Sequence, residues 1–429
     1  MRGATNRKGE SMTIIEKILS KSSGEKVKPN DRVWADVNLA VIRDFGGPNV
    51  VIEYEKTFGD RPVWDPSKVA LTFDYQAPAK VSEVANNQRI CREFAKRQGI
   101  HKLFNVNSGI GQHVLLEQGL IHPGSVVVGT DSHMNLLGAV GCFATGVGTT
   151  DMVATWYSGK LWFRVPETIR VNFKGKYSSP TTAKDLTLYF ICRIGPDRPN
   201  YKSLEFFGEV INGFQVHDAI TLASMITEIN GKIGFVPTNH QIFEFLKSRI
   251  GAAPEPVSAD ADAVYSESVD LDIHGLPPQV ACPHTPGNVR PVSEVKGTHI
   301  DFAFVGSCTN GRYEDLSEAA AVLKAGGKVH PSVQLTIVPA TMEVARKCLK
   351  AGHYETFLEA GAIVTNPGCS LCTTGHHGVL GKGDVLISTS NRNFLGKLGK
   401  GSQVYLASPA TVTASAVKGE IADPGEFLR

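Results

Sequence analysis

The sequence lacks the features that mark membrane, nucleic-acid-binding and secreted proteins. None of its 429 residues belongs to an apolar run of the roughly eighteen residues that a membrane-spanning helix needs. Lys and Arg total 44 and Asp and Glu total 42, so the formal net charge of +2 indicates no nucleic-acid or anionic-membrane partner. Residues 1–11 are basic and polar without the apolar core of a signal peptide, and we expect them to be disordered. These absences favour a cytoplasmic protein.

A disulfide framework is absent as well. The eight cysteines are spread over a long chain, whereas disulfide scaffolds are short and rich in cysteine. We therefore expect free thiols in a reducing compartment. Most of them fit buried apolar positions, but Cys308, Cys369 and Cys372 stand apart because of the segments around them.

Short apolar runs that end in polar residues and are followed by a helical pattern recur along the chain. Examples are residues 69–73, 103–106 and 126–128, and later 300–305 and 385–387. In open α/β sheets, ligands bind at the carboxyl ends of the strands. The chain is therefore predicted to be an α/β protein of three-layer α/β/α domains with a site along a sheet edge.

The distribution of these patterns predicts three related domains, at residues 1–170, 171–290 and 291–429. The run from Asp31 to Ile42 is expected to form a strand of the first domain. The prolines from Pro277 to Pro291 predict a linker at the end of the second domain.

Two cysteines form a C-x-x-C pair in a loop. Cys369 and Cys372 follow an apolar run at 362–364 that is broken by Asn-Pro-Gly. Cys308 follows another strand at the turn into a helix near Tyr313, where helix N–H groups favour the thiolate. Three thiolates without an obvious fourth suit an iron–sulfur cubane with one open iron, which acts as a Lewis acid.

Spacing alone leaves a second interpretation open. C-x-x-C followed by His376 or His377 is also zinc-site spacing, which would make this a structural zinc protein. A thioredoxin-like dithiol is disfavoured, because Cys369 follows Pro-Gly in a loop and does not open a clear helix.

Three ordered motifs resemble the aconitase superfamily, and within it the large subunits of 3-isopropylmalate dehydratase and homoaconitase. They are VGSCTNGR at 305–312, NPGCSLC at 366–372 and STSNRNF at 388–394, and the resemblance also covers residues 129–171. It implies three domains around a cleft that carries a [4Fe–4S] cluster on Cys308, Cys369 and Cys372.

The resemblance also implies two further sets of site residues. The expected acid/base residues are Asp74, Asp131, His133 and Glu228. The expected substrate-binding residues are Arg43, Ser132, Arg392 and Lys397. A guanidinium such as that of Arg392 binds a carboxylate bidentately, as a di- or tricarboxylate substrate requires.

Several positions depart from the family pattern. They leave two acid/base pairs without their histidine, unless His113 turns into the site, and they leave the exact substrate open. The departures are Tyr75 in place of a His paired with Asp74, Gln112-His113 in place of His-Gln, Lys397 in place of Arg, Arg43 in place of a smaller polar side chain or His, and Ser224 in place of Asn.

The implied activity is that of a hydro-lyase, as in leucine biosynthesis. It would reversibly dehydrate a hydroxy di- or tricarboxylic acid, with rehydration at the adjacent carbon. In aconitase-like enzymes the base is a serine on a fourth domain. This chain ends at Arg429, directly after the third region, so we expect that domain to be a separate small subunit. The alternatives are a homoaconitase, a 2,3-dimethylmalate-type dehydratase, and a cluster-binding protein with lost or altered activity.

Overall fold

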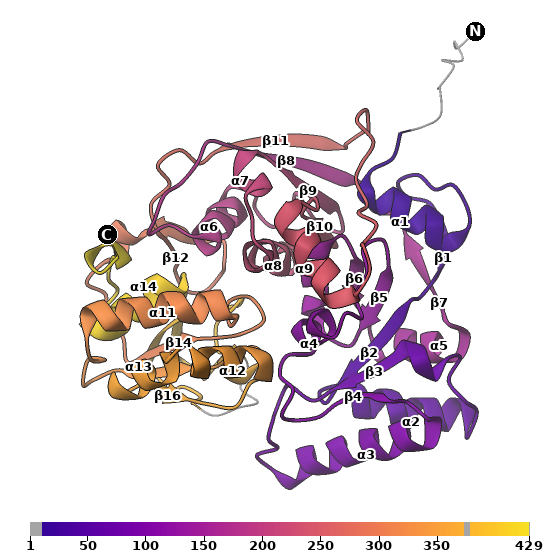
Figure 1. Ribbon diagram of the computed structural model, residues 1–429, viewed down its shortest axis with the longest axis horizontal. Coiled ribbons are helices and arrows are strands. Elements are labelled where there is room, and N and C mark those ends of the chain that lie inside the picture. The colour runs from indigo at the N-terminus through magenta and orange to yellow at the C-terminus, as the bar shows by residue number, and fades with distance from the viewer. Residues whose placement is uncertain (1–10, 373–377, 429) are drawn as a thin grey trace.

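The computed structural model describes residues 11–372 and 378–428 and arranges them as three sheets covered by helices, with a separate two-stranded ribbon (Figure 1). The α/β prediction is confirmed. Residues 1–11 were predicted to be disordered, and all of them except Ser11 lie outside the described residues, as do the candidate zinc ligands His376 and His377. Within the described part of the chain, no helix has both the length and the apolar character needed to cross a membrane.

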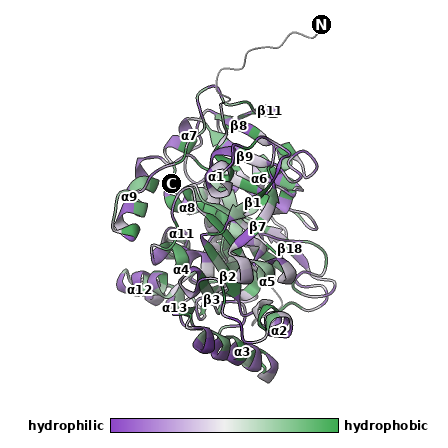
Figure 2. Cartoon of the chain, turned by 90° about the vertical axis from the view of Figure 1, so that its right-hand side faces the viewer, coloured by the Kyte–Doolittle hydropathy of each residue, from purple (hydrophilic) through white to green (hydrophobic). Residues whose placement is uncertain are grey.

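The first sheet is parallel, with the order β4-β3-β2-β5-β6. Its strands β3 and β5 are apolar and buried along their whole length, as expected for a sheet covered on both faces. The outer helix α3 is largely hydrophilic, and the strands near it are hydrophobic (Figure 2). The elements are β2 (Leu39–Arg43), α2 (Gly47–Phe58), β3 (Val69–Thr72), α3 (Ser82–Gln98), β4 (Lys102–Phe104), α4 (Gly111–Glu117), β5 (Val126–Gly129), η2 (Ser132–Val140), β6 (Phe143–Gly146) and α5 (Thr149–Ser158).

The second sheet is also parallel, with the order β10-β9-β8-β11. Helix α6 begins at a capping box in which Thr182 and Asp185 satisfy each other's backbone N–H groups. The elements are β8 (Thr168–Lys174), α6 (Ala183–Ile194), β9 (Ser203–Phe207), α7 (Glu209–Asn212), α8 (Val216–Ser224), η3 (Met225–Ile229), β10 (Ile233–Phe235), α9 (His240–Ile250) and β11 (Glu267–Asp272).

The third sheet has the order β13-β12-β18-β17-β14-β15-β16, in which β12 and β13 are antiparallel to their neighbours. The elements are β12 (Gln279–Ala281), β13 (Val289–Pro291), α10 (Val292–Val295), β14 (Phe302–Val305), α11 (Tyr313–Gly326), β15 (Gln334–Ile337), α12 (Met342–Lys350), α13 (His353–Glu359), β16 (Ile363–Val364), η4 (Ser370–Cys372), β17 (Val385–Ser388), β18 (Gln403–Leu406) and α14 (Pro409–Lys418).

Two local predictions were wrong. The stretch from Pro277 to Pro291 is not a linker, because it supplies β12 and β13, and its prolines are tolerated at the sheet edge. The run from Asp31 to Ile42 is not one strand. It divides into β1 (Arg32–Asp36), which pairs with β7 (Lys160–Arg164) in the ribbon beside α1 (Ile14–Ser23), and β2 in the first sheet. The residues of β1 alternate between exposed and buried, whereas Leu39–Ile42 of β2 are continuously buried.

The three sheets share one strand order, which the sequence analysis had not specified. When strands are numbered along the chain within each parallel set, the first and third sheets both read third-second-first-fourth-fifth, and the second reads third-second-first-fourth. The order reverses between the first and fourth strands, which are β2 and β5 in one sheet and β14 and β17 in another. Ligands bind at such switch points, at the carboxyl ends of the strands. The domain boundaries at 170 and 290 stay a prediction.

Candidate active site

The switch points of the first and third sheets face one cavity of about 280 Å³. All three predicted cysteines line it, together with most of the predicted acid/base and substrate residues. Only Asp74 and Glu228 of those residues are absent from its wall, and each contacts a residue that lines it. The loops that leave β2, β5, β14 and β17 therefore converge, although they are distant in sequence.

The three thiols lie in tight loops. Ser307, before Cys308, has φ 82°, and Ser370, after Cys369, has φ 45°, so a left-handed residue stands beside two of the thiols. Such backbone strain in residues other than glycine is concentrated at functional sites. The Cys369 N–H donates to the carbonyl oxygen of Asp74 at 2.9 Å, which joins the thiol loop to the first sheet.

Burial controls the chemistry of the thiols. It raises the pKa of Cys308 and Cys369 well above the usual value, and it raises the pKa of Cys372 as well. The expectation that helix N–H groups favour a Cys308 thiolate was wrong. Helix α11 begins only at Tyr313, and desolvation dominates. A metal that binds here must displace the thiol protons.

The donor set fits an iron–sulfur cluster. Among residues 11–372 and 378–428, no three His, Cys, Asp or Glu side chains meet closely enough to hold a single metal ion. The three thiols line one cavity, and thiolates are the ligands that hold iron–sulfur clusters. The side chain of Asn391 lies 3.6 Å from the Cys308 sulfur through Oδ1, and its buried Nδ2 has no partner within the described chain.

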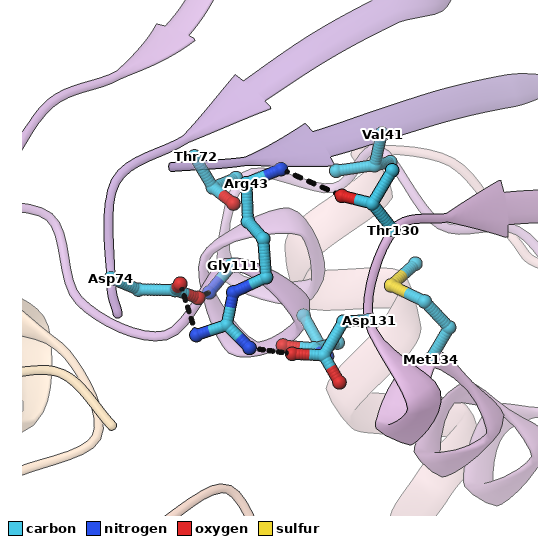
Figure 3. Close-up of a pocket in the computed structure, with 9 residues that line it drawn as sticks. Val41, Arg43, Thr72, Asp74, Gly111, Thr130, Asp131 and Met134 are labelled. Atoms are coloured by element: carbon cyan, nitrogen blue, oxygen red, sulfur yellow. Dashed lines mark hydrogen bonds and ion pairs between the residues drawn. The ribbon is translucent and has the colours of Figure 1, made fainter. Parts of the chain in front are cut away.

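Arg43 lies between Asp74 and Asp131 at the edge of the first sheet (Figure 3), and it connects this sheet to the third through Cys369. Its Nη1 pairs with Asp131, its Nη2 lies 2.7 Å from Asp74 Oδ1, and the same nitrogen donates to Cys369 Sγ at 2.9 Å. Burial alone would lower the pKa of Arg43, but Asp74, Cys369 and Asp131 raise it well above its usual value. The guanidinium is 11% exposed and already engaged by two carboxylates.

The two carboxylates respond differently to this shared cation. Burial raises the pKa of Asp74 to about 6, although Arg43 opposes the shift. The pKa of Asp131 falls well below its usual range, because Arg43 and His133 outweigh its burial. Asp131 Oδ1 also accepts from the His133 N–H at 2.7 Å, and Asp74 Oδ2 accepts from the Gly111 N–H at 2.7 Å. Asp131 is therefore the fixed anion of the pair.

A second network brings together residues of all three sheets. His133 Nε2 lies 2.8 Å from Glu228 Oε1, and Arg392 Nε donates to the same oxygen at 2.8 Å. Arg392 Nη2 donates to Ser132 Oγ at 3.1 Å. Burial would lower the pKa of His133, but Asp131 and Glu228 raise it. Glu228 was expected here only from the resemblance, and the structure places it between the imidazole and the guanidinium.

His113 does not turn into the cavity. Arg312 donates to its Nδ1 at 3.0 Å, so Nε2 carries the proton and donates to the Cys308 carbonyl oxygen at 2.8 Å. Burial, reinforced by Arg312, lowers the pKa of His113 to about 3, which keeps the ring neutral. The hydrogen bond from its Nε2 holds the backbone carbonyl of Cys308 in place.

Sequence reasoning missed Lys184. It lies fully buried in α6, and its Nζ donates to the carbonyl oxygens of Thr389 and Ser390 at 2.9 and 3.0 Å, just before the Arg392 segment. A lysine in an otherwise ordinary helix carries no signal of this contact. Ser224, which replaces the family's Asn, contacts Thr309 next to Cys308 through its hydroxyl at 3.1 Å.

Comparison with known proteins agrees with this arrangement. The model of the Aconitase family (aconitate hydratase) matches residues 16–299 and 290–419. The chain is 47% identical to 3-isopropylmalate dehydratase large subunit 1 of Methanopyrus kandleri, over 97% of this chain and 99% of that protein. It is 43% identical to the probable methanogen homoaconitase large subunit of Methanothermobacter thermautotrophicus, over 96% of this chain and 97% of that protein.

A solved structure supports the fold. The holo form of aconitase X from Thermococcus kodakaraensis aligns with a TM-score of 0.50 at 14% identity, covering 83% of this chain and 84% of that one. At this identity the likeness concerns the fold alone. On the family match and the full-length relatives, the chain belongs to the aconitase family.

Proposed function

We propose that this chain is the large subunit of an iron–sulfur hydro-lyase that dehydrates a hydroxy di- or tricarboxylic acid and rehydrates the double bond at the adjacent carbon. The observation that carries the proposal is the single cavity in which three buried thiols face Arg392, Lys397 and His133. Relatives over the whole chain are named as large subunits of 3-isopropylmalate dehydratase and of homoaconitase, which supports both the reaction type and a second, small subunit.

Cys308, Cys369 and Cys372 would hold a [4Fe–4S] cluster. When bound, such a cluster with one iron not held by the protein supplies a Lewis acid for the substrate hydroxyl. The Arg43 guanidinium, which donates to Cys369 Sγ, would stabilise the thiolate form of that ligand.

The cations of the cavity would bind the substrate carboxylates. Arg392 is oriented by Glu228 through Nε and by Ser132 through Nη2, which fixes the plane of its guanidinium at the wall. Lys397 lines the same cavity and offers a point charge. Two anchored carboxylates hold the hydroxyl carbon in one orientation, which is the contribution that positioning makes to such a reaction.

Proton transfer would involve His133. Asp131 and Glu228 raise its pKa and so favour the protonated imidazole, with Glu228 accepting from Nε2 and Asp131 3.7 Å from Nδ1. We assign to this group the proton that the leaving hydroxide takes up, with Asp131 and Asp74 as the neighbouring carboxylates. The base that removes the proton from the adjacent carbon would come from the small subunit.

The cellular location is part of the proposal. All eight cysteines are free thiols, and three of them are assigned to an oxygen-sensitive group. We therefore place the protein in the reducing environment of the cytoplasm.

Anaerobic reconstitution tests the cluster. The chain is incubated with iron and sulfide, and bound iron, bound sulfide and the visible spectrum are measured. Serine substitutions at Cys308, Cys369 and Cys372 should each abolish the cluster spectrum. Cys192→Ser, at an exposed thiol of α6, is the matched control and should leave it unchanged. Stoichiometric zinc in place of iron would contradict the proposal.

Turnover is tested with the loaded chain and its cognate small subunit. The complex should convert a hydroxy acid into the isomer that carries its hydroxyl on the adjacent carbon, and the chain alone should not. A loaded complex without turnover would favour a cluster-binding protein, and full activity of the single chain would contradict the two-subunit proposal.

A further inference from the structure

One part of the cavity wall is apolar, in contrast to the charged part around Arg392 and Lys397. Phe45 and Tyr75 line the cavity, and their rings stack with centroids 4.4 Å apart and planes 25° apart. Phe45 follows β2 and Tyr75 follows β3, so the pair stands at the carboxyl ends of neighbouring strands. Phe45 remains 58% exposed, which leaves its ring available to a ligand.

The backbone holds this pair in place. Asp44, buried between the two loops, accepts from the N–H groups of Asp74, Tyr75 and Gln76 at 3.1, 2.9 and 3.2 Å. Gln88 of α3 donates to the same carboxylate at 3.1 Å. These bonds tie the loop after β2 to the loop after β3. The aromatic wall is therefore preformed, and a substrate would not have to order it.

The cation beside this wall is not free to bind a third carboxylate. The Arg43 guanidinium lies 5.3 Å from the centre of the Tyr75 ring, but it already pairs with Asp74 and Asp131 and donates to Cys369. A carboxylate placed against the rings would therefore lose its hydrating water. It would also lie near the carboxylates of Asp74 and Asp131, whose two negative charges exceed the single positive charge of Arg43. An alkyl group in the same place would bury apolar surface against the rings.

We propose that Phe45 and Tyr75 are specificity-determining residues of this subunit. The pair receives an alkyl substituent of a hydroxy dicarboxylate and rejects a substrate whose third substituent is a carboxylate. The inference rests on the proposed function and narrows it to one substrate class, with the selecting residues named.

The test uses the reconstituted complex of both subunits, with 3-isopropylmalate and homoaconitate as the two probes. The unmodified complex should have a kcat/KM at least about tenfold higher for 3-isopropylmalate. Phe45→Ala should lower kcat/KM for 3-isopropylmalate about tenfold or more, mainly through KM, and should leave the cluster spectrum unchanged. Phe45→Arg should shift the preference towards homoaconitate.

Two further variants test whether the substrate preference depends on the aromatic rings that line the cavity. Tyr75→Phe keeps the ring and should keep the preference. Tyr157→Ala removes one ring of the Phe58–Tyr157 stack, whose centroids are 4.2 Å apart and which does not line the cavity, and it should leave both kcat/KM values unchanged.

Three results would overturn the inference alone. They are a preference of the unmodified complex for homoaconitate, a reversal of preference by Tyr75→Phe, and an equal loss on both probes in Phe45→Ala. A complex that carries its cluster but converts neither probe would instead overturn the proposed function, and the inference with it.

Discussion

The first and third sheets have the same strand order, but the chemistry at their carboxyl edges differs. At the first edge the groups are charged, and the chain pairs them itself, with Arg43 between Asp74 and Asp131. At the third edge three thiols lie beside Arg392 and Lys397, and the buried Nδ2 of Asn391 and Oγ of Ser370 have no hydrogen-bond partner among the described residues. The same strand order thus carries one edge at which the chain pairs a buried cation with two carboxylates, and one edge at which three thiols line the cavity.

The difference between the two edges is not complete, because unpartnered buried polar atoms occur at the first edge as well. The Nε of Arg43 also lacks a hydrogen-bond partner within the described chain, while its Nη2 reaches across to Cys369. The second sheet contributes Glu228, which lies after α8 and away from its own switch point. At that switch point Asp272 and His274, next to the end of β11, are exposed and pair with each other. Strand order alone therefore does not create a site.

The largest effect is expected from removing the ion pairs at the carboxyl edge of the first sheet. Arg43→Gln removes the cation and leaves Asp74 and Asp131 buried beside each other, so the free energy of unfolding should fall by about 3–5 kcal/mol. Denaturation of the metal-free chain, followed by circular dichroism, measures this loss. Arg43→Lys, which keeps one charge, should lose less. An unchanged unfolding midpoint in Arg43→Gln would show that the first edge is not held by these pairs.

The next effect concerns the link between the edges. Glu228→Gln keeps the shape but removes the charge between His133 and Arg392, and kcat should fall about 100-fold because the imidazole loses its raised pKa. Steady-state kinetics of the two-subunit complex measures it. The matched control is Glu209→Gln, at an exposed carboxylate paired with Lys176. Wild-type kcat in Glu228→Gln would remove this residue from the mechanism.

A smaller effect on stability, which depends on pH, is expected from the buried ammonium of Lys184 near the third edge. Burial lowers the pKa of Lys184 to about 8, below the unfolded-state value of about 10.4. Between these values the unfolded chain binds more protons, so stability should rise with pH by up to about 1.4 kcal/mol per pH unit. Below pH 8 both states are protonated and this dependence vanishes. Lys184→Met should lack the rise in melting temperature between pH 8 and 10.

The control for the lysine is Lys176→Met, at an exposed position. It should follow the wild-type pH profile. If Lys184→Met follows that profile too, the buried ammonium does not titrate in this range.

The smallest effect is expected far from both edges. Arg89 and Glu93 form an exposed ion pair on α3, where solvent and salt screen the charges. Arg89→Ala should leave the melting temperature and kcat unchanged in both low and high salt. A loss comparable to that of Arg43→Gln would remove the distinction between buried and exposed pairs on which the comparison depends.

Much of the fold followed from local patterns. The approximate positions predicted for β3, β5, β14 and β17 agree with the structure. The break between β1 and β2 was missed, although Asp36 and Asn38, which are residue types that favour turns, stand at it. The role of Lys184 was missed because its partners lie about 200 residues away and leave no mark on the helix.

The sequence by itself determined the alternation of strands and helices, the three thiols and the cations of the site, because these are properties of contiguous residues and short motifs. Only the tertiary structure decided that Arg43 is already neutralised, that Glu228 meets His133 and Arg392, and that Phe45 stacks on Tyr75. The physical reason is that charge pairing, desolvation and ring stacking depend on separations of a few ångströms. Those separations are set by how three independently patterned sheets pack together.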